Sequence, residues 1–226
     1  MAHLMVGAGL DSQGDFTHHI KCLGPLEDNV EHLRQKISAL GITFVVIDSA
    51  AYACGGEPDK VQFAMQFFAA YQRLGVPALI IAHQTKDSKA QMPFGSVAWH
   101  NSARATWEVK HQQTAGDGAI TIGLFHRKAN NSEKYKPLAF RIAFGLDQII
   151  IGKANLLKST ELSKELSISE QIAGVLQDGP ATVAYLAETL EKTESTIRGT
   201  LNRYRDQFTQ SHTTSGPAQW EIKGPE

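Results

Sequence analysis

Cysteine and long apolar runs are both scarce in this chain of 226 residues. Its two cysteines, Cys22 and Cys54, are too few for a disulfide framework or a cysteine-rich zinc site, so we expect both to stay reduced. No apolar run approaches the roughly 20 residues that cross a bilayer. The start of the chain also lacks the basic region and long apolar core of a secretory signal. These absences predict a cytoplasmic, soluble protein with no membrane partner.

A large excess of charge and a phosphate-binding loop are missing as well. The formal net charge of -1 gives no global attraction to nucleic acid, so any DNA contact must come from a local patch. The motif G-x-x-x-x-G-K-[ST], whose backbone amides hold nucleotide phosphates, does not occur. The Gly-rich segment 7–14 has no lysine and contains Asp11, whose charge would repel phosphate. We therefore reject this segment as a phosphate-binding loop.

The first half of the chain has the pattern of alternating helices and strands. A helix is predicted over 27–40 and a buried strand over 43–47. A second helix over 58–74 carries Val61, Met65, Phe68 and Tyr71 on one face, and a second apolar strand follows at 77–82. Strand, helix and strand at these spacings predict a parallel sheet covered by helices on both faces.

The pattern changes after the second strand. A helix is expected from Ser96 to about Arg104, and alternating half-buried strands follow it. These strands are predicted at 106–111, 119–125, 138–144 and 149–151. The predicted fold class is therefore α/β, with a mostly parallel sheet that is flanked by helices and ends in antiparallel strands.

The last quarter of the chain reads as a separate domain. Residues 1–152 are predicted to form the core, 153–167 a linker and 168–226 a small second domain. Three helices are expected in that domain, over 169–176, 182–190 and about 193–206, followed by two short strands within 208–222. Helix, helix, helix and β-hairpin is the order of a winged helix-turn-helix.

Polar side chains follow both predicted parallel strands. Asp48 and Ser49 follow the first strand, at the sheet edge where ligands bind in open α/β folds. An aspartate there is suited to hold Mg²⁺ on a nucleotide phosphate, although one that only caps the next turn fits Asp48 equally well. The second strand ends in His83-Gln84-Thr85-Lys86, whose side chains can reach a γ-phosphate or its attacking water. Two adjacent strands with polar ends favour a site.

Two later segments could complete such a site. Gly95-Ser96 opens a helix with free amides for an anion, and Asn101 and Arg104 of that helix are expected to line the site. Arg104 could equally be a solvated helix end. Arg127 and Lys128 follow a strand and belong either to a solvated hairpin or to a contact with nucleotide in a neighbouring subunit, as in ring ATPases.

The third helix of the second domain is the candidate DNA-binding element. Ile197, Leu201 and Tyr204 form its predicted inward face. Short polar groups followed by arginines on the outer face suit a recognition helix. These residues are Ser195, Thr196, Arg198, Asn202, Arg203 and Arg205. The alternative is a protein-binding winged helix that serves in dimerisation.

Taken together, these segments resemble the RecA-superfamily ATPases, in particular the hexameric-helicase and replication-protein branch of plasmids, phages and prophages. The matching segments cover about residues 20–145 and comprise 44–50, 52–58, 83–86, 93–104, 126–131 and 138–142. The resemblance implies ATP and Mg²⁺ as cofactors, a ring of identical subunits and work on DNA in replication or maintenance. It assigns Asp48 as the magnesium-ordering acid, His83 and Gln84 as γ-phosphate sensors, and Arg127 and Lys128 as the trans-acting basic pair.

The chain departs from that family at its start, where the Walker A strand, loop and helix are missing. We expect this to reflect a missing first part, and we expect ATP binding by this chain to be weak or absent. Two other functions stay open. The chain could be a winged-helix DNA-binding regulator with a degenerate sensor domain, or a non-catalytic assembly subunit that keeps the fold for ring packing.

Overall fold

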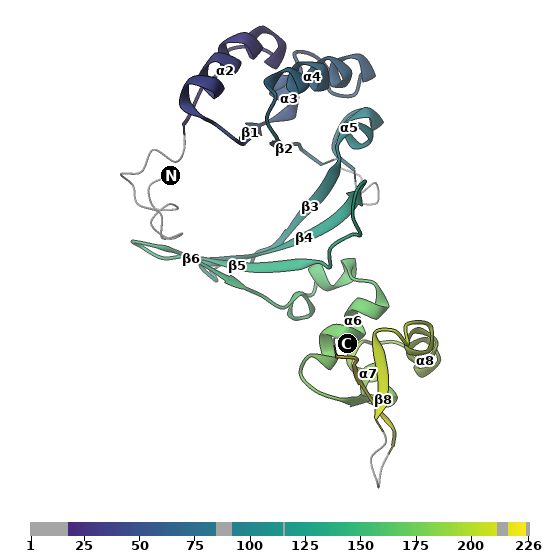
Figure 1. Ribbon diagram of the computed structural model, residues 1–226. Coiled ribbons are helices and arrows are strands. Elements are labelled where there is room, and N and C mark those ends of the chain that lie inside the picture. The colour runs from purple at the N-terminus through teal and green to yellow at the C-terminus, as the bar shows by residue number, and fades with distance from the viewer. Residues whose placement is uncertain (1–17, 85–91, 115, 212–216, 225–226) are drawn as a thin grey trace. The chain divides into compact units, whose positions relative to one another are not determined.

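The computed structural model describes residues 18–84, 92–114, 116–211 and 217–224 (Figure 1). The chain divides into two compact units. We call the first the β1–β2 unit; its described part is 18–108 together with 126–135. The second, which we call the tail-bearing unit, contains 109–125 and the chain from 136 onward. In the described ranges, no helix is long and apolar enough to cross a membrane.

The β1–β2 unit is built on two parallel strands that the sequence predicts. Strand β1 pairs with β2 in register, with Val45 opposite Ala78 and Asp48 opposite Ile81. The connection between them runs through helices, as a parallel pair requires. The elements of this unit are α2 (Leu26–Leu40), β1 (Val45–Asp48), α3 (Ala50–Ala53), α4 (Val61–Leu74), β2 (Ala78–Ile81) and α5 (Val97–Ser102).

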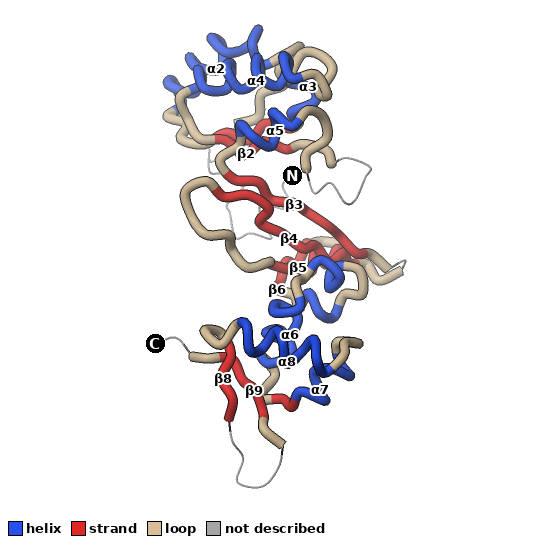
Figure 2. The backbone as a smooth tube through the Cα atoms, turned by 90° about the vertical axis from the view of Figure 1, so that its right-hand side faces the viewer, coloured by secondary structure: helices blue, strands red, loops and turns tan. Residues whose placement is uncertain are grey.

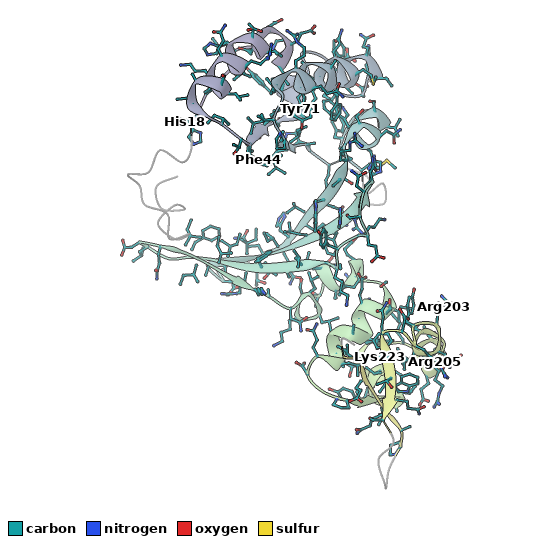
Figure 3. All side chains as sticks on the ribbon, viewed as in Figure 1. His18, Phe44, Tyr71, Arg203, Arg205 and Lys223 are labelled. Carbon is teal, nitrogen blue, oxygen red and sulfur yellow. The ribbon has the colours of Figure 1, made fainter. Side chains whose placement is uncertain are left out.

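Among the described residues, helices cover one face of this two-stranded sheet, whereas the sequence predicts helices on both. Helices α2 and α4 lie together on one side (Figure 1), and the inward residues of β1 and β2 pack against the core that they share. Figure 3 shows Phe44 on the side away from the helices. With Val46, Leu79 and Ile81 it forms what we call the open face, whose four side chains are 42 to 57% exposed. The parallel sheet is thus smaller and less covered than predicted.

Aromatic packing joins α4 to α5 in the core of this unit. The ring of Phe67 lies 5.0 Å from that of Trp99 and 5.4 Å from that of Phe68. The indole N–H of Trp99 donates to the carbonyl of Pro58 at 2.9 Å, and the amide of Ser96 donates to the same oxygen at 3.0 Å. These contacts fix the start of α5 against the loop before α4.

Gly95 allows this close approach. Its φ is 111°, a conformation that favours glycine. A Cβ atom at this position would lie 2.3 Å from the carbonyl oxygen of Pro58. The turn into α5 therefore requires glycine both for its backbone conformation and for space.

A four-stranded sheet follows, with the order β3-β4-β5-β6. Pairing of β4 with β5 and of β5 with β6 is antiparallel, which confirms the prediction that the fold ends in antiparallel strands. Strand β4 continues four residues beyond its predicted end at Phe125. The strands are β3 (Ala105–Gln112), β4 (Ala119–Ala129), β5 (Leu138–Phe144) and β6 (Ile149–Lys153).

The segment predicted as a linker, 153–167, is packed rather than extended. It contains two 3₁₀ helices, η1 (Leu156–Lys158) and η2 (Leu162–Glu165). Leu156 and Leu162 are buried in a cluster with Phe125 and Ala139. Lys110 Nζ contacts the carboxylate of Glu165 at 2.6 Å. This segment therefore belongs to the tail-bearing unit, while the domain boundaries at 152 and 167 stay predictions.

The predicted helices and strands of the C-terminal region are all present (Figure 2). Helix α6 begins with a capping box, in which Ser167 and Glu170 satisfy each other's backbone amides. Ile197 and Leu201 are fully buried and Tyr204 packs beside them, which confirms the predicted inward face of the third helix. The elements are α6 (Ile168–Leu176), β7 (Ala181–Thr182), α7 (Val183–Thr189), α8 (Glu194–Arg203), β8 (Phe208–Ser211) and β9 (Gln219–Ile222), with the sheet order β7-β9-β8.

Candidate functional site

The polar ends of β1 and β2 lie at the same edge of the sheet. Asp48 is the last residue of β1 and lies opposite Ile81, the last residue of β2. His83 and Gln84 follow β2 after Ala82, so the parallel direction of the strands puts them at the same edge as Asp48. Asp48 and His83 are both exposed, and the Asp48–Ser49 peptide bond is cis. The spatial prediction is confirmed, while the roles of these residues stay predictions.

A buried carboxylate joins two of the predicted site residues. Gln84 Nε2 donates to Glu108 Oε1 at 2.6 Å, and Arg127 Nε donates to Glu108 Oε2 at 2.7 Å. The side chain of Glu108 is 5% exposed and that of Arg127 is 18% exposed. The paired charges and the amide satisfy both carboxylate oxygens of Glu108. The segment after β2 is thereby tied to β3 and β4.

Lys128 is also engaged within its own chain. Its Nζ donates to three backbone carbonyls at the end of α5, those of His100 at 2.8 Å, Asn101 at 2.9 Å and Ala103 at 2.8 Å. An ammonium group has three donors, and these contacts use all of them. A cation at a helix C-terminus is also favoured by the helix dipole. Lys128 therefore fixes α5 to β4, and a role in a neighbouring subunit would require it to leave these carbonyls.

The start of α5 is occupied by internal contacts. Ser96 is buried, its Oγ accepts from the amide of Ala98 at 3.3 Å, and its own amide binds Pro58. Helix α5 has only six residues. The predicted anion site at Ser96 therefore has little left to offer a ligand, whereas Asn101 and Arg104 remain exposed near the other end of the helix.

Two further predicted residues lie beside Asp48 and Gln84 in the sequence. Ser49 is the N-cap residue of α3, but its side chain makes no capping hydrogen bond there. Because the hydroxyl of Ser49 makes no capping bond, it can rotate toward a ligand at the sheet edge. Lys86, like Thr85, lies outside the described residues.

The pKa of His100 reports the positive charge near the end of α5. Burial lowers the pKa of His100 from its ordinary value, and the charges of Lys128 and Lys134 lower it further. The imidazole therefore takes up a proton only at a lower pH than an ordinary histidine does. The same interactions show that Lys128 and Lys134 both act on this region with positive charge.

The described residues fit a magnesium ion only as part of a metal–nucleotide complex. Within the described ranges no cluster of three or more His, Cys, Asp or Glu side chains could hold a metal. Mg²⁺ commonly uses one carboxylate together with substrate phosphates and water, and Asp48 meets that requirement. A hollow of about 90 Å³ is lined by the start of α2, the end of α3 and the middle of α4, with Pro25, Cys54 and Phe67 among its residues. It contains none of the predicted site residues and is small for a nucleotide, since ligand pockets usually measure about 300–1,000 Å³.

The predicted DNA-contacting residues of the tail lie on or beside α8, and all are exposed. Arg198 pairs with Glu194 at 2.8 Å, and Arg205 donates to Asn202 at 2.9 Å. The amide and the hydroxyl of Thr196 both bond to Thr193 at the helix start. Figure 3 shows Arg203 and Arg205 projecting from the region of α8. The polar groups of Thr196 are therefore used in the N-cap of α8, while the side chain of Arg203 is exposed to solvent.

Glu108 is the residue that sequence reasoning missed. The sequence points the other way, because Glu108 alternates in step with polar residues of the strand, whereas the structure buries Glu108 and exposes its apolar neighbours Trp107 and Val109. Such a residue on the inward side needs a partner of opposite charge. The sequence alone does not say that this partner is Arg127.

Comparison with known proteins assigns no family. No family model matches the sequence, and no curated protein matches it. Among solved structures, a KaiC-like protein from the hyperthermophilic archaeon Pyrococcus horikoshii OT3 has a TM-score of 0.40 and 11% sequence identity. The similarity covers 56% of this chain and 54% of that protein, so this chain spans about half of its length. Similarity at this level carries no argument about the function of the chain.

Proposed function

We propose that the chain is the core of a RecA-like ATPase that works on DNA in replication or maintenance. In this proposal Asp48 orders Mg²⁺ on the nucleotide, and His83 and Gln84 sense the γ-phosphate. Identical subunits assemble in a ring, and the phosphate cradle is supplied from outside the described residues. The observation that carries the proposal is the shared edge of β1 and β2, where Asp48, His83 and Gln84 follow adjacent parallel strands.

The contacts of Gln84 give this site a physical mechanism. Gln84 is held by Glu108, and Glu108 is held by Arg127 on β4. A change at the nucleotide that moves Gln84 would therefore disturb a buried ion pair. Because buried pairs are costly to break, such a network has discrete arrangements rather than a continuous range. It supports a sensor that transmits nucleotide state to the strands behind it.

Nucleotide binding at this edge can be measured on the chain as it is. We expect magnesium-dependent shifts of the amide NMR signals of Asp48, Ser49, His83 and Gln84 in the presence of MgATP. Without a phosphate cradle the expected dissociation constant is about 1 mM or weaker, equal to about −4 kcal/mol. In the Asp48→Asn variant these shifts should lose their dependence on Mg²⁺, because the carboxylate that orders the ion is gone.

Asp59→Asn is the matched control, since Asp59 is an exposed aspartate of the same unit outside this edge. That variant should respond like the parent chain. Shifts confined to other elements, or an unchanged magnesium response in Asp48→Asn, would contradict the proposal. The latter result would favour a non-catalytic assembly subunit.

For the tail we propose a winged-helix domain that contacts DNA through α8. The supporting observations are the order of three helices and a β-hairpin, and the exposed arginines at the end of α8. Arg203 and Arg205 suit phosphate contacts, because arginine binds phosphate oxygens in a bidentate manner. Since Arg198 is paired with Glu194, we expect it to contribute less.

Fluorescence anisotropy with a labelled duplex tests this contact. Replacing both Arg203 and Arg205 by alanine should weaken binding and reduce the salt slope by roughly 2, because each lost phosphate contact removes about 0.9 from it. Lys164→Ala is the control, since Lys164 is an exposed cation of the same unit beside Glu161. An unchanged slope in the double variant would indicate a protein-binding domain instead. Duplex binding without any response to ATP would favour a DNA-binding regulator.

A further inference from the structure

Three aromatic rings cluster at one end of β3 and β4, with two of them stacked face to face and the third beside both. The ring of Trp107 on β3 lies 4.3 Å from that of His126 on β4, and their planes differ by 1°. The ring of Tyr135, which follows the loop after β4, lies 5.5 Å from His126 and 6.0 Å from Trp107. All three residues belong to the β1–β2 unit. We call this group the aromatic stack.

One ring of the aromatic stack is buried while the other two are exposed. His126 is 7% exposed, whereas Trp107 is 40% and Tyr135 is 66% exposed. His126 Nδ1 accepts from the amide of Tyr135 at 2.9 Å, so the neutral ring carries its proton on Nε2. That Nε2 is buried and has no hydrogen-bond partner in the described part of the chain. An unpaired buried donor is costly, and a ligand acceptor that reached it would be stabilised.

The surroundings of the stack carry more positive than negative charge. Lys134 immediately precedes Tyr135, and its charge acts on His100, as does that of Lys128. Arg104 is exposed three residues before Trp107, and its carbonyl accepts from the amide of Asn130 at 3.0 Å. Of the acidic neighbours, Glu108 is neutralised by Arg127, and Glu133 is exposed. The balance favours a ligand that combines flat rings with negative charge.

We propose that the aromatic stack is a binding platform for single-stranded nucleic acid, in which bases stack on Trp107 and Tyr135 and the backbone phosphates lie near Lys134 and Arg104. Aromatic faces beside cations are the usual combination in proteins that bind single strands without sequence preference. The openness of the platform favours a strand over a free nucleotide, because small-ligand sites generally enclose most of their ligand. This surface differs from the exposed face of α8, and its use requires no ATP.

Tryptophan fluorescence provides a direct assay, because Trp107 is the exposed tryptophan of the three in the chain. Trp99 and Trp220 are 4% and 8% exposed. The test uses the Arg203→Ala, Arg205→Ala chain, so that DNA contact through the tail is weakened, with EDTA and no nucleotide. Oligothymidylate of about 20 residues should quench the fluorescence saturably. Trp107→Phe should remove most of the quenching.

Tyr135→Ala should weaken binding roughly 5- to 100-fold in fluorescence anisotropy, since that range corresponds to one lost base stack. Tyr135 lies in an exposed loop, so this variant is suited to retain the fold, which circular dichroism checks. Phe44→Ala is the control, because Phe44 is an exposed aromatic of the same unit on a different surface. The assay contains EDTA and no nucleotide, so this result and the ATPase result can fail separately.

Three outcomes would overturn the inference. The first is the absence of saturable quenching by the oligonucleotide. The second is unchanged affinity in both Trp107→Phe and Tyr135→Ala. The third is tighter binding of dTMP or of a proline-rich peptide than of the oligonucleotide, which would indicate a mononucleotide site or a peptide groove.

Discussion

Replacement of Glu108 by alanine is expected to lower the free energy of unfolding of the β1–β2 unit by about 3 kcal/mol or more. The change removes the carboxylate that pairs with the largely buried guanidinium of Arg127 and that accepts from Gln84. Loss of one partner of a buried ion pair typically costs about 3–5 kcal/mol. Hydrogen exchange in peptides from α4 and β2 measures this unit by itself.

A double substitution separates the contribution of the ion pair to the free energy of unfolding from the effect of removing one partner alone. Replacing Glu108 and Arg127 together by methionine should recover most of the loss, because apolar substitution of both partners is often neutral. Glu57→Ala serves as a surface control, since its ion pair with Lys60 is solvent-exposed and should matter by less than about 0.5 kcal/mol. If the amide hydrogens of Glu108→Ala exchange at the same rates as those of the parent chain, the Glu108 carboxylate does not stabilise this unit.

Replacement of Trp99 by alanine is the second large effect that we expect, at about 3–5 kcal/mol. The indole is 4% exposed and packs against Phe67 and Phe68. Its removal creates a cavity and leaves the carbonyl of Pro58 with one donor fewer. The measurement is again hydrogen exchange across α4 and β2.

Trp99→Phe distinguishes packing from hydrogen bonding. This variant keeps an aromatic ring and should cost about 1 kcal/mol for the lost bond, plus the effect of a smaller ring. Val61→Ala is a suitable control on α4, because the side chain of Val61 is 54% exposed. A loss of similar size in the Val61 variant would mean that stability does not depend on the contact between α4 and α5.

The sequence predicts the elements of the β1–β2 unit well, because apolar runs and glycine stops are local signals. It predicts the inner face of α4 less well. Val61 and Met65 are exposed, although Phe68 and Tyr71 of the same predicted face do pack in the core. Helix α4 carries apolar residues nearly all round, so its pattern does not select one face. The choice depends on where α2 and α5 lie, which is tertiary information.

The candidate site shows the same division between local and tertiary information. Strand direction alone brings Asp48 and Gln84 to one edge, and sequence reasoning reaches that result. The partners of Arg127 and Lys128 depend on how β4 lies against β3 and α5, and no local pattern encodes it. The sequence of a basic pair at a strand end is the same whether its side chains project into solvent, contact a neighbouring subunit or bind within their own chain. Here both bind within the chain.

The unstaggered pairing of β1 with β2 restricts how the length of the chain can vary. Side chains of a strand alternate between faces, so losing or gaining one residue between Gly75 and Pro77 would shift β2 by one position. Ile80 would then leave the helical core, and Leu79 and Ile81 would enter it from the open face. Natural relatives and engineered tags should therefore vary in length elsewhere. The exposed turn at Gly116–Gly118 is such a place for added residues, provided that the two glycines, which have positive φ, are kept.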